Sequence, residues 1–226
     1  MGDVEIVHTY QKRWNETPRD ELADCRACEC STDVELLAFI KKDEEAIEAA
    51  QPLLNGEESC STVPQSTYGH VLLPLIRPGR AEEAAKIHSK GYSKIAGNPK
   101  FLVTASEHLQ FLVHQRKLVK AVQVLERHYP LVLESAVGYE QYYFYRAAQL
   151  LFEALARNGS RPTRKFRFQE SCPIWREDRS YEVAAVLDFF CEQTKTIAQQ
   201  FDQRNGNDHF SQQVEEYREL FLGDLA

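Results

Sequence analysis

One stretch, residues 72–88, constrains the fold of this chain more than any other. Its sequence, LLPLIRPGRAEEAAKIH, predicts the end of one helix, a tight turn and the start of a second helix that packs back against the first. Pro78-Gly79 ends the first helix, and Glu82-Glu83 occupies the first turn of the next, where the helix dipole favours negative charge. The small side chains of Ala84-Ala85 allow the two backbones to approach closely. The stretch therefore predicts a helical hairpin.

The same unit recurs along the chain. The sequence Glu-Glu-Ala that ends at Ala46 is repeated at Ala84, and Lys-Ala at Ala121 takes the same place in a third copy. The three alanines lie 38 and 37 residues apart, slightly more than the 34 residues of a tetratricopeptide repeat. Stacked copies bury a shared core that none could bury alone. We therefore expect an all-α fold, built as a right-handed superhelical stack of helical hairpins.

We expect three parts within a single structural domain. Residues 1–158 form the helical repeats, residues 159–180 form a loop-rich connection, and residues 181–226 form a C-terminal helical pair packed on the repeats. Apolar side chains at helical spacing mark the helices, and Asn and Gly mark the ends of the helices. The expected helices cover residues 4–14, 34–40, 44–54, 67–76, 99–114, 118–133, 139–157, 181–203 and 209–222.

Several short sequence motifs resemble those of a known protein family. They are WNETPRDELADCRAC at residues 14–28, Ser59-Cys60, Val63-Pro64, Thr67-Tyr68, residues 72–80, Gly91-Tyr92, FDQRNGND at residues 201–208, and Phe210-Ser211. In these motifs, which span nearly the whole chain, the sequence resembles a family of bacterial tetratricopeptide-repeat proteins. Members typically carry further repeats ahead of the Trp14 region, so the chain resembles a shortened, C-terminal version. The resemblance implies a helical-repeat scaffold and supplies no catalytic residues.

The cysteines form the sharpest chemical pattern. Cys25 and Cys28 precede the first helix of a hairpin and Cys60 follows the second. The two ends of an antiparallel hairpin lie side by side, so Cys60 can face the other two. Three thiolates and one more ligand complete a tetrahedral zinc site, and either Cys30 or His70 could supply the fourth ligand. Such a zinc ion would be structural and would pin the hairpin closed.

Other interpretations of these cysteines stay open. The thiols could be reduced, packed side chains, or a disulfide, although a reducing cytosol disfavours disulfides. The same residues could instead form the centre of a metal-dependent enzyme or sensor.

The chain has no glycine-rich phosphate loop and no Gly-x-Ser-x-Gly motif. His88, His108, His114 and His128 fall at scattered helical phases and fit surface or core-edge positions. We therefore predict a protein that is not an enzyme.

Two aromatic groups are candidates for partner binding. The first helix carries Tyr10 and Trp14 on an apolar face near the start of the chain, where a repeat stack would leave an uncovered edge. A protein partner or a second copy of the chain could cover this edge, which makes a homodimer a prediction. Among the tyrosines at residues 139–145, we expect most to fill the core and Tyr139 and Tyr142 to form a surface pair.

Charge and hydropathy set further limits. The net charge is −7, whereas a nonspecific nucleic-acid binder needs a basic face. The short basic run at residues 161–167 is better explained as a solvated loop. There is no apolar run of the roughly 20 residues that a membrane-spanning helix needs, and no signal peptide follows Met1. We expect a soluble cytoplasmic protein that binds neither membranes nor nucleic acid.

These observations favour one function and keep a second. The favoured function is a protein-interaction scaffold that holds a peptide or a partner protein on the concave face of the stack, as a regulator or a toxin-neutralising (immunity) protein would. The alternative is a metal-dependent enzyme or sensor centred on Cys25, Cys28 and Cys60.

Overall fold

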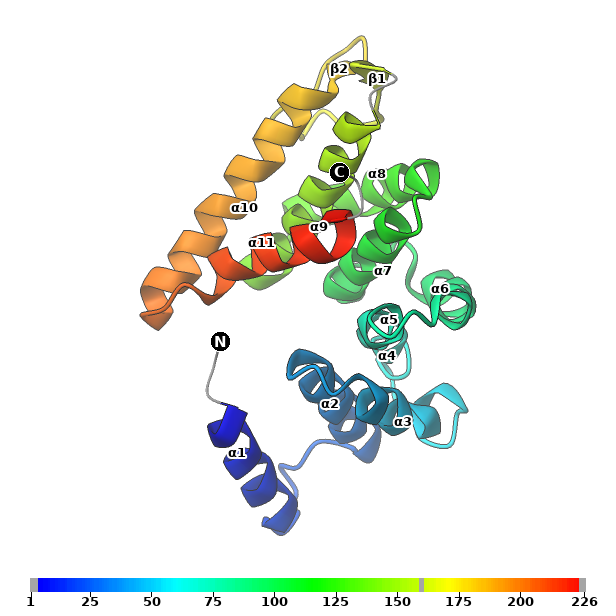
Figure 1. The fold of residues 1–226 in the computed structure, drawn as a ribbon, viewed down its shortest axis with the longest axis vertical. Coiled ribbons are helices and arrows are strands. Elements are labelled where there is room, and N and C mark those ends of the chain that lie inside the picture. The colour runs from blue at the N-terminus through cyan, green and yellow to red at the C-terminus, as the bar shows by residue number, and fades with distance from the viewer. Residues whose placement is uncertain (1–3, 159–160, 224–226) are drawn as a thin grey trace. The chain divides into compact units, whose positions relative to one another are not determined.

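The structure, a computed structural model, describes residues 4–158 and 161–223 and is mostly helical (Figure 1). The elements are α1 (Val4–Glu16), α2 (Arg26–Phe39), α3 (Asp43–Leu54), α4 (Thr67–His70), α5 (Leu72–Ile76), α6 (Ala81–Ile95), the 3-10 helix η1 (Pro99–Phe101), α7 (Leu102–His114), α8 (Leu118–Glu134), α9 (Gly138–Arg157), β1 (Thr163–Lys165), β2 (Ser180–Glu182), α10 (Val183–Asn205) and α11 (His209–Leu222). The predicted all-α class is confirmed, with one small sheet added among the described residues.

The chain divides into two compact units, Met1–Ala84 and Ala85–Ala226. The division falls inside α6, within the predicted repeat region. In the first unit α2 packs on α3 and α4, and α3 packs on α5. In the second unit α9 contacts α7, α8, α10 and α11. The predicted C-terminal pair corresponds to α10 and α11, which pack on α9 and on each other.

The predicted repeat is visible in the first turns of three helices. Ala46, Ala84 and Ala121 are each the fourth residue of their helix, in α3, α6 and α8. All three are fully buried. A methyl group at this position allows the close approach between backbones that the sequence predicted.

The turns before these helices share one backbone geometry. Five residues before each alanine, the chain adopts the left-handed conformation, at Lys41 (φ 61°), Gly79 (φ 83°) and Arg116 (φ 54°). The next N–H then donates back to a carbonyl five residues earlier, over 2.9, 2.8 and 2.9 Å: Lys42 to Leu37, Arg80 to Leu75 and Lys117 to Leu112. This is the Schellman arrangement, which satisfies carbonyls at the end of a helix. The turns before α3, α6 and α8 are therefore three copies of one helix-ending turn.

Two predicted helix boundaries were wrong in the first unit. Helix α2 begins at Arg26, eight residues before the predicted start at Val34. The predicted helix over residues 67–76 is two short helices, α4 and α5. Pro74, the third residue of α5, accounts for the restart, because it has no N–H to donate to the carbonyl of His70 and so interrupts the helical hydrogen bonds there.

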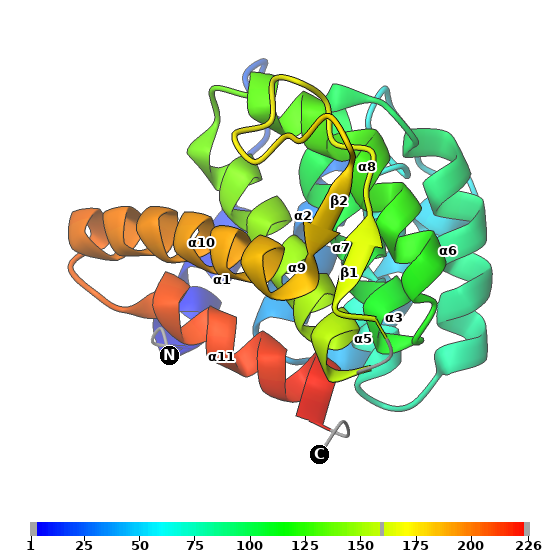
Figure 2. The same ribbon diagram turned by 90° about the horizontal axis from the view of Figure 1, so that it is seen from above.

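The connection between α9 and α10 contains a short β-hairpin in place of the predicted loop. The predicted connection starts at residues 159 and 160, which lie outside the described residues. Strands β1 and β2 pair antiparallel, with Thr163 opposite Glu182, and β2 leads directly into α10 (Figure 2). Phe166 and Phe168 are buried in this segment, whereas Trp175 is exposed.

A three-cysteine candidate metal centre

Two of the three site cysteines belong to the first turn of α2. Cys25 is the N-cap residue, with extended backbone (φ −67°, ψ 154°), and Cys28 is the third residue of the helix. Side chains at the N-cap and third helical positions face each other, as the pair in a capping box does. A Cys-x-x-Cys sequence at a helix start therefore brings both thiols to one side.

The third cysteine, Cys60, is held by a turn between α3 and α4. Its backbone N–H donates to the carbonyl of Val63 over 2.8 Å, and its Sγ lies 3.6 Å from the hydroxyl of Thr62. Because α2 and α3 form a hairpin, this turn returns the chain to the start of α2. The predicted convergence of Cys60 with Cys25 and Cys28 is therefore present.

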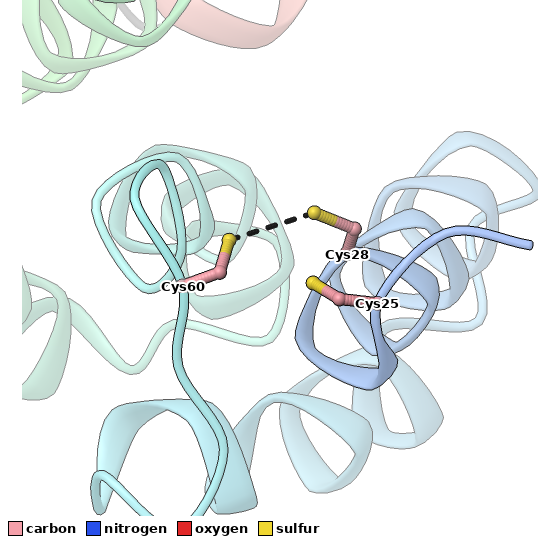
Figure 3. A group of neighbouring side chains, drawn as sticks. All are labelled: Cys25, Cys28 and Cys60. Atoms are coloured by element: carbon pink, nitrogen blue, oxygen red, sulfur yellow. Dashed lines mark hydrogen bonds between the residues drawn. The ribbon is translucent and has the colours of Figure 1, made fainter.

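The three sulfur atoms form one compact group. All lie within 4.8 Å of one another, and Cys28 Sγ lies 3.5 Å from Cys60 Sγ (Figure 3). Sulfurs bound to one tetrahedral zinc ion at about 2.3 Å lie about 3.8 Å apart. Small side-chain rotations would bring all three thiolates to that spacing. The residues present therefore fit a thiolate-bound metal ion, with three ligands from the chain.

Two of the three thiols have shifted pKa values. A hydrogen bond with Cys25, together with burial and the neighbouring Cys60, raises the pKa of Cys28 to about 12. A hydrogen bond with the Thr62 backbone lowers the pKa of Cys60 to about 7, against the effect of burial. Cys60 is therefore more readily ionised than Cys28 near neutral pH.

The site rests on an apolar base. Ala27 from α2, Leu53 from α3 and Val63 from the turn form a buried cluster, and Cys28 and Cys60 pack against it. This cluster joins the three segments that carry the ligands. The thiols are therefore positioned by packing that exists without a metal ion.

Neither predicted fourth ligand belongs to the group. Among the described residues, the group of potential metal ligands at this place consists of Cys25, Cys28 and Cys60. Cys30 follows Cys28 by two helical residues, which turns its side chain about 200° around the helix axis. His70 ends α4, beyond the turn that carries Cys60. His70 as a fourth ligand therefore stays a prediction.

The predicted partner-binding residues have different outcomes. Tyr10 and Trp14 are 63% and 58% exposed, four residues apart on α1, and Tyr139 is 37% exposed. Tyr142 is fully buried, and its hydroxyl donates to the carbonyl of Phe210 over 2.6 Å. The prediction that Tyr142 lies at the surface is wrong, because α11 covers this side of α9.

The sequence interpretation missed a histidine cluster in the second unit. His88 Nδ1 and His108 Nδ1 lie 2.9 Å apart, and the Tyr92 ring lies 5.7 Å from His108 and 5.9 Å from His128. His108 Nε2 and His128 Nδ1 are buried without a hydrogen-bond partner in the described structure. Burial lowers the pKa of His88 and of His128 to about 4, and it lowers the pKa of His108 well below the usual histidine value. No local sequence pattern pointed to this cluster, because the three histidines come from α6, α7 and α8.

A cavity of about 430 Å³ in the second unit is lined by α9, α10 and α11. Its buried carboxylate, Glu153, accepts hydrogen bonds from Arg218 over 2.7 Å and from Gln149 over 3.0 Å. Cys191 also lines it, but burial and the charge of Glu153 raise the pKa of this thiol. The carboxylate is paired and the thiol is protonated, so the cavity carries no activated nucleophile.

Within residues 4–158 and 161–223, every helix is too short or too polar to cross a membrane. Comparisons of the chain with protein-family models, with curated proteins and with solved structures found no match.

Proposed function

We propose that the protein is a helical-repeat interaction module of the tetratricopeptide type whose first unit is clamped by one zinc ion. The observation that supports the clamp is the convergence of Cys25, Cys28 and Cys60 from two segments of the chain, with all three sulfurs within 4.8 Å. The repeated α2–α3, α5–α6 and α7–α8 turns support the repeat type. Proteins built from such repeats commonly bind peptides or protein partners on exposed helical faces.

The clamp would act by joining the two ends of a hairpin. Cys25 and Cys28 start α2, and Cys60 follows α3, so a shared ion would hold the α2–α3 pair and its turn in one arrangement. Zinc, when bound, supplies a positive charge that keeps thiolates deprotonated. The chain supplies the positions, through the cap of α2 and the Val63 turn. We place this function in the cytoplasm, where thiols stay reduced.

The partner surface proposed for the first unit is the exposed stripe of α1. Ile6, Tyr10 and Trp14 are spaced by four residues and therefore lie along one side of the helix. Large exposed aromatic side chains are enriched at the centres of protein interfaces. A protein or peptide with an apolar helical face would cover this stripe, as would a second copy of the chain. A regulator or a toxin-neutralising protein would bind a protein or peptide partner of this kind.

One observation favours a second candidate function, a metal sensor. Structural zinc sites normally have four protein ligands, whereas sites that exchange ligands keep an open position. The group here holds three. An ion bound by it would keep one position for water or an external ligand, and Cys25 at the exposed edge would let it exchange.

Native mass spectrometry of protein purified from its own cells without chelator tests the proposal. We expect one zinc ion per chain, lost on acidification, and a protein partner at fixed stoichiometry. The Tyr10→Ser/Trp14→Ser double variant should lose the partner and keep zinc, while Cys60→Ser should lose zinc. Lys12→Ala, on the opposite side of α1, is the matched control. A partner-free monomer whose metal content is unchanged in Cys60→Ser would contradict the proposal.

A further inference from the structure

We infer that the same three thiols bind trivalent arsenic, presented as arsenous acid, as a three-coordinate ligand set. This inference rests on the site of the proposed function, but not on the presence of zinc. It follows from the number, the spacing and the exposure of the sulfurs, together with the coordination chemistry of the ion.

The number of ligands favours a three-coordinate ion. Among the described residues, the group holds Cys25, Cys28 and Cys60, while Cys30 and His70 lie outside it. Zinc in a closed protein site takes four ligands, so three leave it incomplete. Trivalent arsenic carries a lone pair and is complete with three sulfurs in a pyramid. It is also a soft centre, which thiolate ligands select.

The spacing suits a pyramid with its three sulfurs on one side. Cys28 Sγ and Cys60 Sγ are already 3.5 Å apart, close to sulfur–sulfur contact, and Cys25 completes the triangle within 4.8 Å (Figure 3). The apolar cluster beneath them fixes the segments that carry the sulfurs. Since little ordering is needed on binding, little affinity is lost to conformational entropy.

The sulfurs can be reached from solvent. Cys25 is exposed, and Cys28 and Cys60 are half-buried. Cys172, in contrast, is buried, and its thiol donates to the hydroxyl of Tyr129 over 3.7 Å. The reactive group is therefore both accessible and distinct from the thiol of the second unit's core.

The binding step balances without an oxidant. Arsenous acid, As(OH)₃, reacts with three cysteine thiols to give As(S-Cys)₃ and three molecules of water. Three As–O bonds break and three As–S bonds form, and each thiol proton leaves with a hydroxyl group. The oxidation state of arsenic and that of each sulfur stay unchanged. The product would cross-link the start of α2 to the turn after α3, as the zinc clamp would.

The test uses the reduced, zinc-free, full-length protein and sodium arsenite as the probe. Intact mass should show one arsenic atom per chain, and alkylation should find three of the six cysteines protected. Peptide mapping of the wild-type protein should place the protection on Cys25, Cys28 and Cys60. Each single Cys→Ser variant of this group should bind at least about tenfold more weakly, since loss of even an outer-shell partner costs roughly 10- to 100-fold.

The matched controls are Cys30→Ser and Cys191→Ser, half-buried thiols outside the group, which should bind arsenite as the wild-type protein does. Equal binding by Cys60→Ser, or protection of Cys30 or Cys191 in the wild-type map, would overturn the inference. Because the peptide mapping uses the wild-type chain, it shows which cysteines bind arsenite even where a variant does not fold.

The experiment also separates this inference from the zinc clamp. Arsenite binding at the three mapped thiols in a protein that retains no zinc would support the inference and remove zinc from the proposed function. Zinc retention that arsenite neither displaces nor competes with would overturn the inference and leave the zinc clamp standing.

Discussion

The guanidinium carbon of Arg146 lies 3.7 Å from the centroid of the Tyr217 ring, which joins α9 to α11. The rings of Tyr143 and Tyr142 lie 4.7 and 5.4 Å from the same carbon, and Gln213 accepts a hydrogen bond from Arg146 over 2.8 Å. Arg146 is fully buried. Its charge is therefore stabilised inside the unit by three aromatic faces and one amide oxygen.

Loss of the Tyr217 ring should destabilise the second unit. Tyr217→Leu keeps apolar volume but removes the closest aromatic face from a desolvated cation, which we expect to cost about 2 kcal/mol. Urea denaturation would measure the loss. In an Arg146→Met background no cation remains, so the same tyrosine substitution should cost clearly less. An equal cost in both backgrounds would show that Tyr217 contributes by packing alone.

The stability of the second unit should fall as the pH drops from 6.5 to about 4. The usual histidine pKa is about 6.5, and the half-buried His88 and the buried His128 have a pKa of about 4. Between these values the unfolded chain binds more protons, so the free energy of unfolding decreases with falling pH. For the fully buried His128 the full effect is on the order of 3 kcal/mol. Lys117, Lys120 and Arg127 lie nearby and reinforce the direction.

Denaturant unfolding at pH 7.5 and pH 5 would measure this dependence. The His128→Gln variant should show a shallower pH dependence than the wild-type protein, because one titrating group is gone and the amide oxygen can still accept from the Gly97 N–H, as His128 Nε2 does. His8→Gln, on the exposed surface of α1, is the control and should leave the slope unchanged. A slope that His128→Gln does not alter would contradict the assignment.

The parts of the fold that could be predicted depend on local signals. The Pro78-Gly79 stop and the alanines at the starts of α3, α6 and α8 act over a few residues, so the repeat could be predicted from them. The start of α2 was missed because its N-cap is Cys25, which is not a common capping residue and makes no side-chain cap hydrogen bond.

The parts that could not be predicted depend on which face of each helix another helix covers. Tyr139 and Tyr142 are three residues apart on one helix, and only the position of α11 decides that Tyr142 is covered. The three clustered histidines come from three different helices, and helical spacing within any one of them says nothing of their meeting. Cys60 could be placed because a hairpin brings its two ends together.

Glycine should be the more stable residue at the left-handed turn positions. Gly79→Ala should destabilise the first unit by about 1 kcal/mol, and the cause is backbone strain alone, since no atom lies within 4 Å of the added methyl. Arg116→Gly, at the equivalent place in the second unit, should stabilise by up to about 1 kcal/mol, because its φ of 54° is strained for arginine. Thermal unfolding of both variants checks the pair. Destabilisation by Arg116→Gly would mean that the arginine side chain contributes more than the strain costs.

Removal of the metal should destabilise the first unit selectively. Zinc bound to folded but not unfolded protein adds stability by mass action, about 4 kcal/mol at a free concentration 1,000-fold above its dissociation constant. A chelator should therefore lower the melting temperature of the wild-type protein and leave that of Cys60→Ser unchanged. Acidification should have the same effect as the chelator, because protons compete with the metal for the thiolates. Cys30→Ser, one helical face away from the site, should respond to chelator as the wild-type protein does. Equal melting temperatures of the wild-type protein with and without chelator, after loading with zinc, would contradict a clamp at these three cysteines.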